Sequence, residues 1–282
     1  MPQFDAKSFI RGCLPSGLRY LLLRLLGMAI RFDGPRSSWH EATTLAGGYD
    51  ADLILDKVLN STLSVKRGEA VYERDSILFD NIEYSWPVLS GLLWGAAKNG
   101  GRLDVLDFGG ALGSSYFQNR AFLDRLEHVR WNVVEQAHFA GCGRRHIQDH
   151  RLRFYPSISD CVMDCRPNVV LLSSVLQYME NPLEILTNLA SMAVDCLIID
   201  RTIINRSTTS RLYVQHVPKH IYEASYPCWS LSENALRTIL ETKQYECISE
   251  FTSLPFPALR AIKSEFKGYI YIQRARTMAR PS

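Results

Sequence analysis

Short apolar runs alternate with helix-forming segments from Leu103 onward, and this alternation limits the possible folds more than any other feature. The runs are apolar on both faces, as are strands buried between two layers of helices. The expected strands are 103–108, 129–135, 152–155, 168–173 and 195–200, with helices at 115–128, 138–148 and 182–191. The pattern predicts an α/β fold with a doubly wound, mostly parallel sheet.

Two further segments complete the expected sheet. Residues 245–252 and 268–273 look like a closing antiparallel pair, which brings the sheet to seven strands. Residues 1–100 look helical by contrast, with a turn at 31–38, and Asn99-Gly100-Gly101 marks a boundary. We therefore expect a helical N-terminal region over 1–100 that shapes a substrate site, followed by a ligand-binding domain over 101–282.

Composition and charge exclude several classes of function. The net charge is only +3, and the basic residues are dispersed, so no nucleic-acid surface is predicted. The seven cysteines have no regular spacing. Cys161 and Cys165 lack a second Cys/His pair, so we expect reduced cysteines and no metal site.

The apolar segment 17–32 bears on location. Arg19, Arg24 and Arg31 interrupt it, and it is too short and too charged to span a bilayer. It is either a helix that packs on the core or self-associates, which we favour, or a basic amphipathic helix on a membrane surface. Residues 1–12 are polar and predict no secretory signal. We expect a cytoplasmic protein, with peripheral membrane contact through 17–32 as the alternative.

The first predicted strand runs directly into a glycine turn, Asp107-Phe108-Gly109-Gly110-Ala111-Leu112-Gly113. Glycines at 109, 110 and 113 allow a close backbone approach to a ligand. The helix that follows points unpaired N–H groups and its positive dipole end at that ligand. The turn therefore predicts a nucleotide-type cofactor site.

Polar residues also follow the other predicted strands, where ligands lie in parallel sheets. Glu135 ends the second strand, and its carboxylate can accept hydrogen bonds from both hydroxyls of a ribose. Ser157 follows the third strand, Ser173 and Ser174 end the fourth, and Asp200 ends the fifth. These residues are our candidates for the rest of the site.

The turn resembles motif I of class I S-adenosylmethionine-dependent methyltransferases, with Ala111 where a glycine often stands. A wider set of segments is similar to a family of methyltransferase-like proteins encoded among bacterial surface-polysaccharide genes. The segments are 72–75 (YERD), 106–118 (LDFGGALGSSYFQ), 131–136 (WNVVEQ), 173–178 (SSVLQY), 200–202 (DRT) and 226–229 (YPCW). The resemblance covers most of residues 39–250.

The resemblance implies an enzyme with a Rossmann-like methyltransferase fold, S-adenosylmethionine as cofactor, and a small-molecule or saccharide-linked acceptor. It also assigns the cofactor contacts. The glycine turn would approach the amino-acid part, with Asp107 at the ammonium group; Glu135 would bind the ribose, and Ser157 would border the adenine. Ser173, Ser174 and Gln177 would lie beneath the sulfonium.

Two other functions remain as alternatives. A nicotinamide dinucleotide needs close backbone approach at the central glycine of its fingerprint, and Ala111 hinders that approach. An NAD-dependent oxidoreductase is therefore disfavoured. A non-catalytic binding or scaffold protein would keep the same fold without transferring methyl groups.

Several residues have both a functional and a structural interpretation. His216 is the first candidate for a general base and Asp200 the second. A hydrogen-bonded surface or core residue is the interpretation that we slightly favour for His216, and Asp200 could equally form an internal ion pair with Arg201. Arg74 could bind an anionic substrate or lie at a helix start, and 226–229 could be an aromatic lid or, as we favour, a hydrophobic plug.

Overall fold

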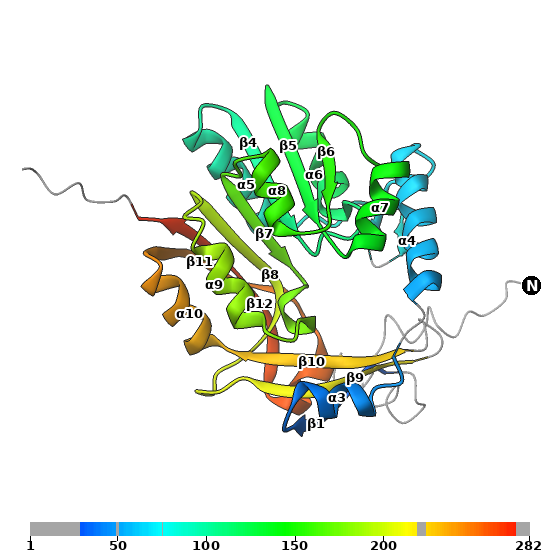
Figure 1. Cartoon of the computed structure of the whole chain (residues 1–282), viewed down its shortest axis with the longest axis vertical. Helices are drawn as coiled ribbons and strands as arrows, with labels where there is room; N and C mark the ends of the chain where they lie inside the picture. Colours follow the sequence, from blue (N-terminus) through cyan, green and yellow to red (C-terminus); the bar gives the residue numbers. More distant parts are fainter. Residues whose placement is uncertain (1–28, 49–50, 75, 219–223, 275–282) are drawn as a thin grey trace, which may run out of the picture.

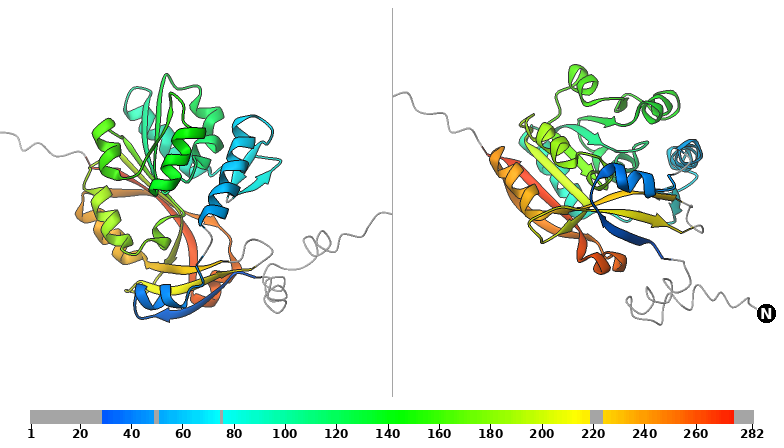
Figure 2. Two further views of the ribbon diagram at one scale, coloured as in Figure 1. Left: turned by 45° about the vertical axis from the view of Figure 1, so that its right-hand side comes forward. Right: turned by 60° about the horizontal axis from the view of Figure 1, so that its bottom comes forward.

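The computed structural model describes residues 29–48, 51–74, 76–218 and 224–274 (Figures 1 and 2). Its parallel strands are β4 (Arg102–Phe108), β5 (His128–Val134), β6 (Leu152–Tyr155), β7 (Val169–Ser173) and β8 (Cys196–Asn205). β12 (Ser264–Gln273) pairs antiparallel with β8, and β11 (Tyr245–Leu254) pairs antiparallel with β12. The resulting order, β11-β12-β8-β7-β4-β5-β6, confirms the expected seven-stranded arrangement and the closing antiparallel pair.

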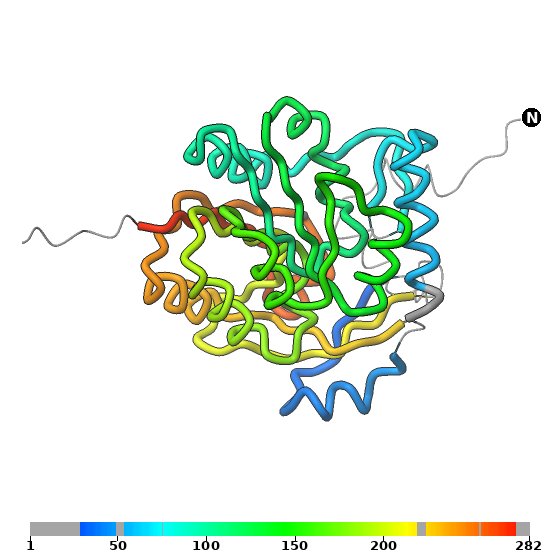
Figure 3. The backbone as a smooth tube through the Cα atoms, turned by 45° about the horizontal axis from the view of Figure 1, so that its top comes forward, coloured from blue at the N-terminus to red at the C-terminus, as the bar shows by residue number. Residues whose placement is uncertain are grey.

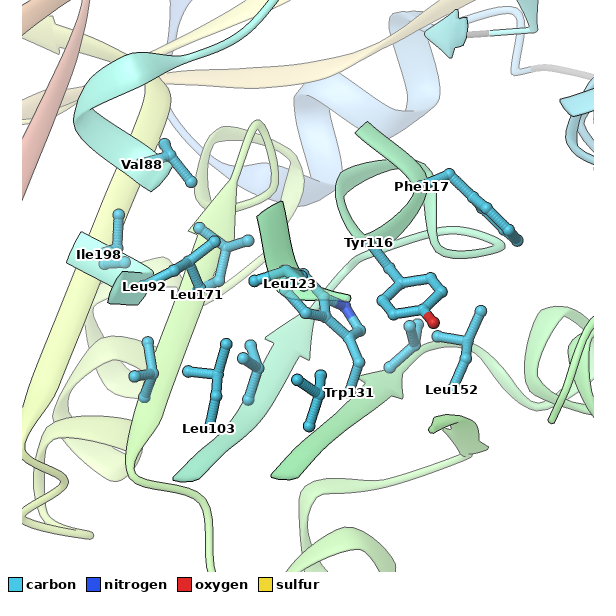
Figure 4. Packing of buried hydrophobic residues seen from close by; sticks show 14 of the residues in the cluster. Val88, Leu92, Leu103, Tyr116, Phe117, Leu123, Trp131, Leu152, Leu171 and Ile198 are labelled. Carbon is cyan, nitrogen blue, oxygen red and sulfur yellow. The ribbon is translucent and has the colours of Figure 1, made fainter. Parts of the chain in front are cut away.

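Helices cover both faces of this sheet, so it is doubly wound. One layer consists of α4 (Ala51–Lys66), α5 (Trp86–Lys98), α6 (Ser114–Leu123) and α7 (Ala137–His146). The other consists of α8 (Ile158–Asp164), α9 (Pro182–Ala190) and α10 (Glu233–Thr242). Strand β7 shows the reason: Val169 and Leu171 are buried in the first layer, Val170 and Leu172 in the second. Figure 4 shows the first layer around Trp131.

Helix α5 joins the N-terminal hundred residues to the sheet. Its Gly95 lies so near β7 that an added Cβ would be 2.4 Å from the Cγ2 atom of Val169. At Gly91 an added Cβ would be 2.7 Å from the Cδ1 atom of Ile198 on β8. Small residues thus let α5 pack closely on the strands. The same hundred residues also contain α3 (Trp39–Leu45) and a two-stranded hairpin, β2 (Tyr72–Arg74) and β3 (Ile77–Phe79).

Three further strands extend the sheet at its carboxyl edge: β1 (Arg31–Arg36), β9 (Arg211–Val217) and β10 (Ala224–Ser232). β1 and β10 each pair antiparallel with β9, and the end of β10 pairs parallel with the end of β8. With them, the described residues form a ten-stranded sheet. Figure 1 shows β9 and β10 crossing below the parallel strands, and Figure 3 shows this crossing from another side. We call β1, β9 and β10 the antiparallel extension.

The extension corrects two sequence-based expectations. Residues 31–36, expected as part of a turn, form strand β1, so Arg31 and Phe32 are not the end of a helix. The remainder of the apolar segment, 17–28, lies outside the described residues. The long stretch between the fifth strand and residue 245, for which the sequence assigns no strand or helix, contains β9, β10 and α10. No described helix is both long enough and apolar enough to cross a membrane.

Candidate functional site

A cavity of about 400 Å³ lies at the carboxyl edge of the parallel strands, between the glycine turn and the antiparallel extension. Six of the predicted cofactor-binding residues line it: Asp107, Gly109, Gly110, Ala111, Ser173 and Ser174. The hairpin β2–β3 and the start of α6 add polar side chains, and the extension adds aromatic ones. The cavity thus joins the sheet edge to segments from both ends of the chain.

The backbone around the cavity is unusually strained. Non-glycine residues rarely adopt positive φ, because the Cβ atom crowds the backbone. Ser76, Ala111, Ser174 and Arg201 have φ angles of 66°, 49°, 58° and 46°, and all four line the cavity. Strain of this kind persists where the surrounding structure holds it, and it concentrates at functional sites.

Two glycines of the turn have no room for a side chain. Gly109 has a φ of +74°, and an added Cβ would lie 2.3 Å from the Cγ2 atom of Val175. A Cβ at Gly110 would lie 2.4 Å from the Oδ2 atom of Asp107. The turn therefore presents bare backbone to the cavity, as a cofactor cradle requires.

Asp107 ends β4 beneath the turn and is 1% exposed. Its Oδ2 atom accepts a hydrogen bond of 2.9 Å from the indole N–H of Trp131. Burial raises the pKa of Asp107 to about 7, and the negative charge of Glu135 adds to this, while the Trp131 hydrogen bond and Arg201 oppose it. Asp107 can therefore take either protonation state near neutral pH.

Glu135 follows β5 and holds the glycine turn from behind. Its Oε1 atom accepts from the backbone N–H of Ala111 at 3.2 Å, and its Oε2 atom accepts from the N–H of Gln136 at 2.8 Å. Burial raises the pKa of Glu135, and these two hydrogen bonds oppose that shift. Glu135 is not among the residues lining the cavity, so it lies beside the turn rather than in the cavity.

Polar side chains tie the end of β7 to the middle of β8, which continues past Asp200 to Asn205. The Ser173 hydroxyl donates to Oδ2 of Asp200 at 2.9 Å, and the Arg201 guanidinium donates to the Ser173 oxygen at 3.2 Å. Asp200 and Arg201 also form an ion pair of 3.4 Å. The buried amide of Gln177 donates to the Arg201 carbonyl at 3.1 Å and to the Ser174 hydroxyl at 3.3 Å. Asp200 and Gln177 thus brace these two strands, and neither lines the cavity.

Two other candidates lie away from the cavity. In the β1–β9 ladder, His216 stands across from Arg31. Its side chain lies on one face of β9, and Gln215 and Val217 lie on the other face and line the cavity. Burial lowers the pKa of His216, as does the charge of Arg31. Ser157 is the N-cap of α8, where its hydroxyl oxygen accepts from the backbone N–H of Asp160 at 3.1 Å. The structure does not bring His216 into position to act on a ligand in the cavity.

The hairpin β2–β3 supplies charged groups to the cavity. Glu73 is 1% exposed and accepts a hydrogen bond from the hydroxyl of Ser114, at the start of α6. Arg74 pairs with Glu83 at 2.9 Å and stacks over the ring of Phe79. Residues 72–74 are therefore a strand rather than a helix start. Glu73 and Arg74 both line the cavity.

The antiparallel extension and its neighbours form an aromatic wall, which we define as Phe32, Tyr178, Tyr226, Phe256 and Phe266. All five line the cavity; Tyr178 comes from the short helix η1 (Leu176–Tyr178), Phe256 lies between β11 and η2 (Pro257–Ile262), and Phe266 is on β12. Gln215 on β9 stands across from Phe32 on β1 and from Tyr226 on β10. These three side chains therefore share one face of the extension.

Residues 226–229 are part of strand β10, not a lid. Tyr226 lines the cavity, whereas Trp229 stacks on Trp39 of α3 at 6.5 Å on the other face. Cys228 is 1% exposed, and burial raises the pKa of its thiol, which disfavours a nucleophilic role. The expected hydrophobic plug is thus divided between two faces of one strand.

Some lining residues gave little signal in the sequence. Phe32 precedes Asp33-Gly34-Pro35, which is typical of a turn. Gln215 stands in an alternating segment for which the sequence analysis predicts no strand. A polar residue at an inward position of such a segment is the signal that could have identified Gln215. Among the described residues, no group of three His, Cys, Asp or Glu side chains could hold a metal ion.

No protein-family model matches the chain, and no curated protein matches it either. Solved structures with a similar course of the chain include the N-terminal domain of EvdMO1, crystallised in the presence of S-adenosylhomocysteine and D-fucose. It is 15% identical, with a TM-score of 0.47, over 81% of this chain and 98% of that one.

Two other structures are similar at the same level. The 1,6-didemethyltoxoflavin-N1-methyltransferase of Burkholderia thailandensis is 16% identical, with a TM-score of 0.38, over 86% of this chain and 92% of that one. The magnesium protoporphyrin IX methyltransferase of Synechocystis PCC 6803 is 15% identical, with a TM-score of 0.42, over 80% and 99%. Likeness this distant identifies no activity, so the function must be inferred from the site itself.

Proposed function

We propose that this protein is an S-adenosylmethionine-dependent methyltransferase that acts on a small-molecule or saccharide-linked acceptor. One observation carries the proposal. A bare glycine turn after β4 is held by the carboxylate that follows β5, and it opens into a cavity at the carboxyl edge of the sheet. This is where doubly wound sheets bind nucleotide-type ligands.

The residues present suit this cofactor. The turn and the first N–H groups of α6 would hold the amino-acid end, with Asp107 near its ammonium group. Glu135 would bind the ribose hydroxyls while keeping its bond to Ala111. When bound, the cofactor supplies a methyl group already activated on a sulfonium. The chain itself then needs to orient the acceptor and exclude water.

The residues that line the cavity suggest separate roles for the two parts of the chain. Residues 101–282 would bind the cofactor, and residues 1–100 would shape the acceptor site through Phe32 on β1 and through Glu73 and Arg74 on β2. A saccharide-linked acceptor, with a role in surface-polysaccharide synthesis, is what the sequence resemblance implies.

Calorimetric titration of the purified full chain tests the proposal. We expect S-adenosylmethionine and S-adenosylhomocysteine to bind, and NAD⁺ to give no heat of binding. Absence of binding by both sulfur compounds would reject the methyltransferase function in favour of a scaffold role. Binding of NAD⁺ alone would favour the oxidoreductase.

Replacement of Glu135 by alanine tests the ribose contact. We expect Glu135→Ala to weaken S-adenosylhomocysteine binding by about 1–3 kcal/mol, because buried hydroxyls would lose their acceptor. Glu127, exposed just before the other end of β5, offers the matched control Glu127→Ala. An affinity unchanged in both variants would remove Glu135 from the site.

A further inference from the structure

The cavity has a charged side and an uncharged side. Asp107, Glu73, Arg74 and Arg201 are its charged lining residues among those described, and they come from the sheet edge and the hairpin β2–β3. The aromatic wall, to which Gln215 adds an amide, makes up the aromatic part of the same lining. Within the described residues, no charged side chain lines the cavity from the antiparallel extension, η1 or β12. The two sides therefore favour different chemical groups.

The charged groups are already engaged within the chain. Arg74 pairs with Glu83 at 2.9 Å, and Arg201 pairs with Asp200 at 3.4 Å. The Glu73 carboxylate accepts from the Ser114 hydroxyl. A ligand that depended on several ionic or hydrogen-bonding groups would have to displace these contacts. The cavity therefore offers it little net gain from charge.

The aromatic wall is held in a fixed arrangement. The Tyr178 hydroxyl donates to Oε1 of Gln215 at 3.4 Å, and Nε2 of Gln215 donates to the Tyr226 oxygen at 3.3 Å. The Tyr178 and Tyr226 rings meet edge to face, with centroids 5.3 Å apart and planes at 85°. Gln215 is 5% exposed, and both ends of its amide are used. One buried amide thus fixes two rings at right angles before any ligand binds.

The remaining rings extend this arrangement. Phe256 and Phe266 pack together with centroids 5.6 Å apart, and both pack on the buried cluster of Ile203, Cys228 and Leu259. Rings anchored in this way lose little conformational entropy when a ligand binds between them. They present flat apolar faces and edges, which another flat ring contacts well.

We propose that the methyl acceptor is a planar aromatic molecule that binds against this wall, an inference that rests on the proposed function. A sugar ring can lay an apolar C–H face on an aromatic ring, but the hydroxyls around its rim need several hydrogen-bonding partners. The wall offers the Gln215 amide, which already serves two tyrosines, and the two tyrosine hydroxyls themselves. An aromatic ring needs only apolar contact and shape, and the wall provides both.

Calorimetry with the full chain saturated with S-adenosylhomocysteine tests the inference. The aromatic probes are catechol, 7-hydroxycoumarin and quercetin, and the sugar probe is methyl α-D-glucopyranoside. We expect at least one aromatic probe to bind and the sugar to give no heat. If no aromatic probe binds, or if the sugar binds more tightly, the inference fails while the proposed function stands. If S-adenosylhomocysteine itself does not bind, the proposed function fails first.

Variants of Tyr226 locate the probe on the wall. We expect Tyr226→Leu to weaken aromatic binding about tenfold, the equivalent of one lost ring contact, and Tyr226→Phe to change it less than threefold. Tyr84→Leu is the control, since Tyr84 packs with Trp86 and Phe122 and does not line the cavity. Unchanged S-adenosylhomocysteine affinity in all three variants shows that each is folded. Equal effects of Tyr226→Leu and Tyr84→Leu would overturn the inference.

Discussion

Two parts of the cavity lining differ in the kind of group that they present to a ligand. On the cofactor side the groups that face the ligand are backbone atoms, presented by a turn in which side chains are excluded at Gly109 and Gly110. On the aromatic side they are side chains, placed by strands whose backbone hydrogen bonds are independent of residue type. A substitution in the turn therefore changes the fold locally, whereas a substitution on the wall changes only the surface offered to a ligand.

This difference predicts that the two sides respond separately to mutation. Changes in the turn should affect folding and cofactor binding together. Changes in the wall should affect the acceptor while cofactor affinity is kept. The following experiments test that separation, beginning with the one that should have the largest effect.

Gly109→Ala tests the glycine turn, which presents its backbone to the cavity. The new Cβ would meet Val175 at 2.3 Å, and alanine disfavours the φ of +74°. We expect the free energy of unfolding, measured in urea, to fall by about 2–5 kcal/mol, the sum of backbone strain and overpacking. Gly68→Ala is the control, because Gly68 has a φ of +76° and no atom within 4 Å of the added Cβ. Equal losses in the two variants would show that Val175 yields without cost.

Asp107→Asn tests the buried carboxyl by its pH dependence. Asp107 has an ordinary pKa of 3.8 that burial raises to about 7 in the folded protein. Between these values the folded state holds a proton that the unfolded chain has released. The stability that the group contributes is therefore present at low pH and lost as the pH rises through about 7.

We expect the unfolding free energy of the wild type to fall by about 2 kcal/mol, relative to Asp107→Asn, between about pH 5 and about pH 7.5. Asparagine keeps an acceptor for the Trp131 indole, so the variant should fold. Urea unfolding of both proteins at the two pH values provides the measurement. Parallel curves would mean that Asp107 has an ordinary pKa and is not shielded from water.

Gln215→Leu tests the aromatic wall, whose ligand-facing groups are side chains. The substitution removes the amide that joins Tyr178 to Tyr226, and we expect a loss of about 1–2 kcal/mol in unfolding free energy. Aromatic probes should bind more weakly, and S-adenosylhomocysteine should bind within twofold of the wild type. The adjacent His216→Leu changes the opposite face of β9, so it should leave both ligands unaffected. Loss of cofactor binding in Gln215→Leu would show that the two sides are not separate.

The same contrast explains which parts of the fold could be predicted. Strand Val169–Ser173 is buried from both sides by helices, so it is a short continuous apolar run that the sequence displays directly. The glycine turn is equally local. Its relation to Glu135 could be anticipated because neighbouring parallel strands end at one edge.

The strands of the antiparallel extension could not be predicted, because β1 and β10 contain residues that are unusual in strands. β1 contains Gly34 and Pro35, which are typical of turns, yet it lies at the sheet edge and its pairing shifts register between Asp33 and Arg36. Pro227 lies in β10 where the only neighbouring strand is β9, so its missing N–H is tolerated among the described strands. Pairing between distant segments stabilises these strands, and the local sequence reports it only weakly. The sequence therefore does not indicate which side of β9 faces inward, and the general base predicted at His216 lies on the outward side.

The row formed by Phe32, Gln215 and Tyr226 has a consequence for how proteins of this kind diversify. Each member stands on a separate strand whose ladder needs no particular side chain, so single substitutions can reshape the wall while the backbone stays in register. The glycine turn offers no such freedom. If the proposed function holds, descendants of this chain could therefore exchange one acceptor for another through substitutions at a few ring positions, while the glycine turn keeps its cofactor.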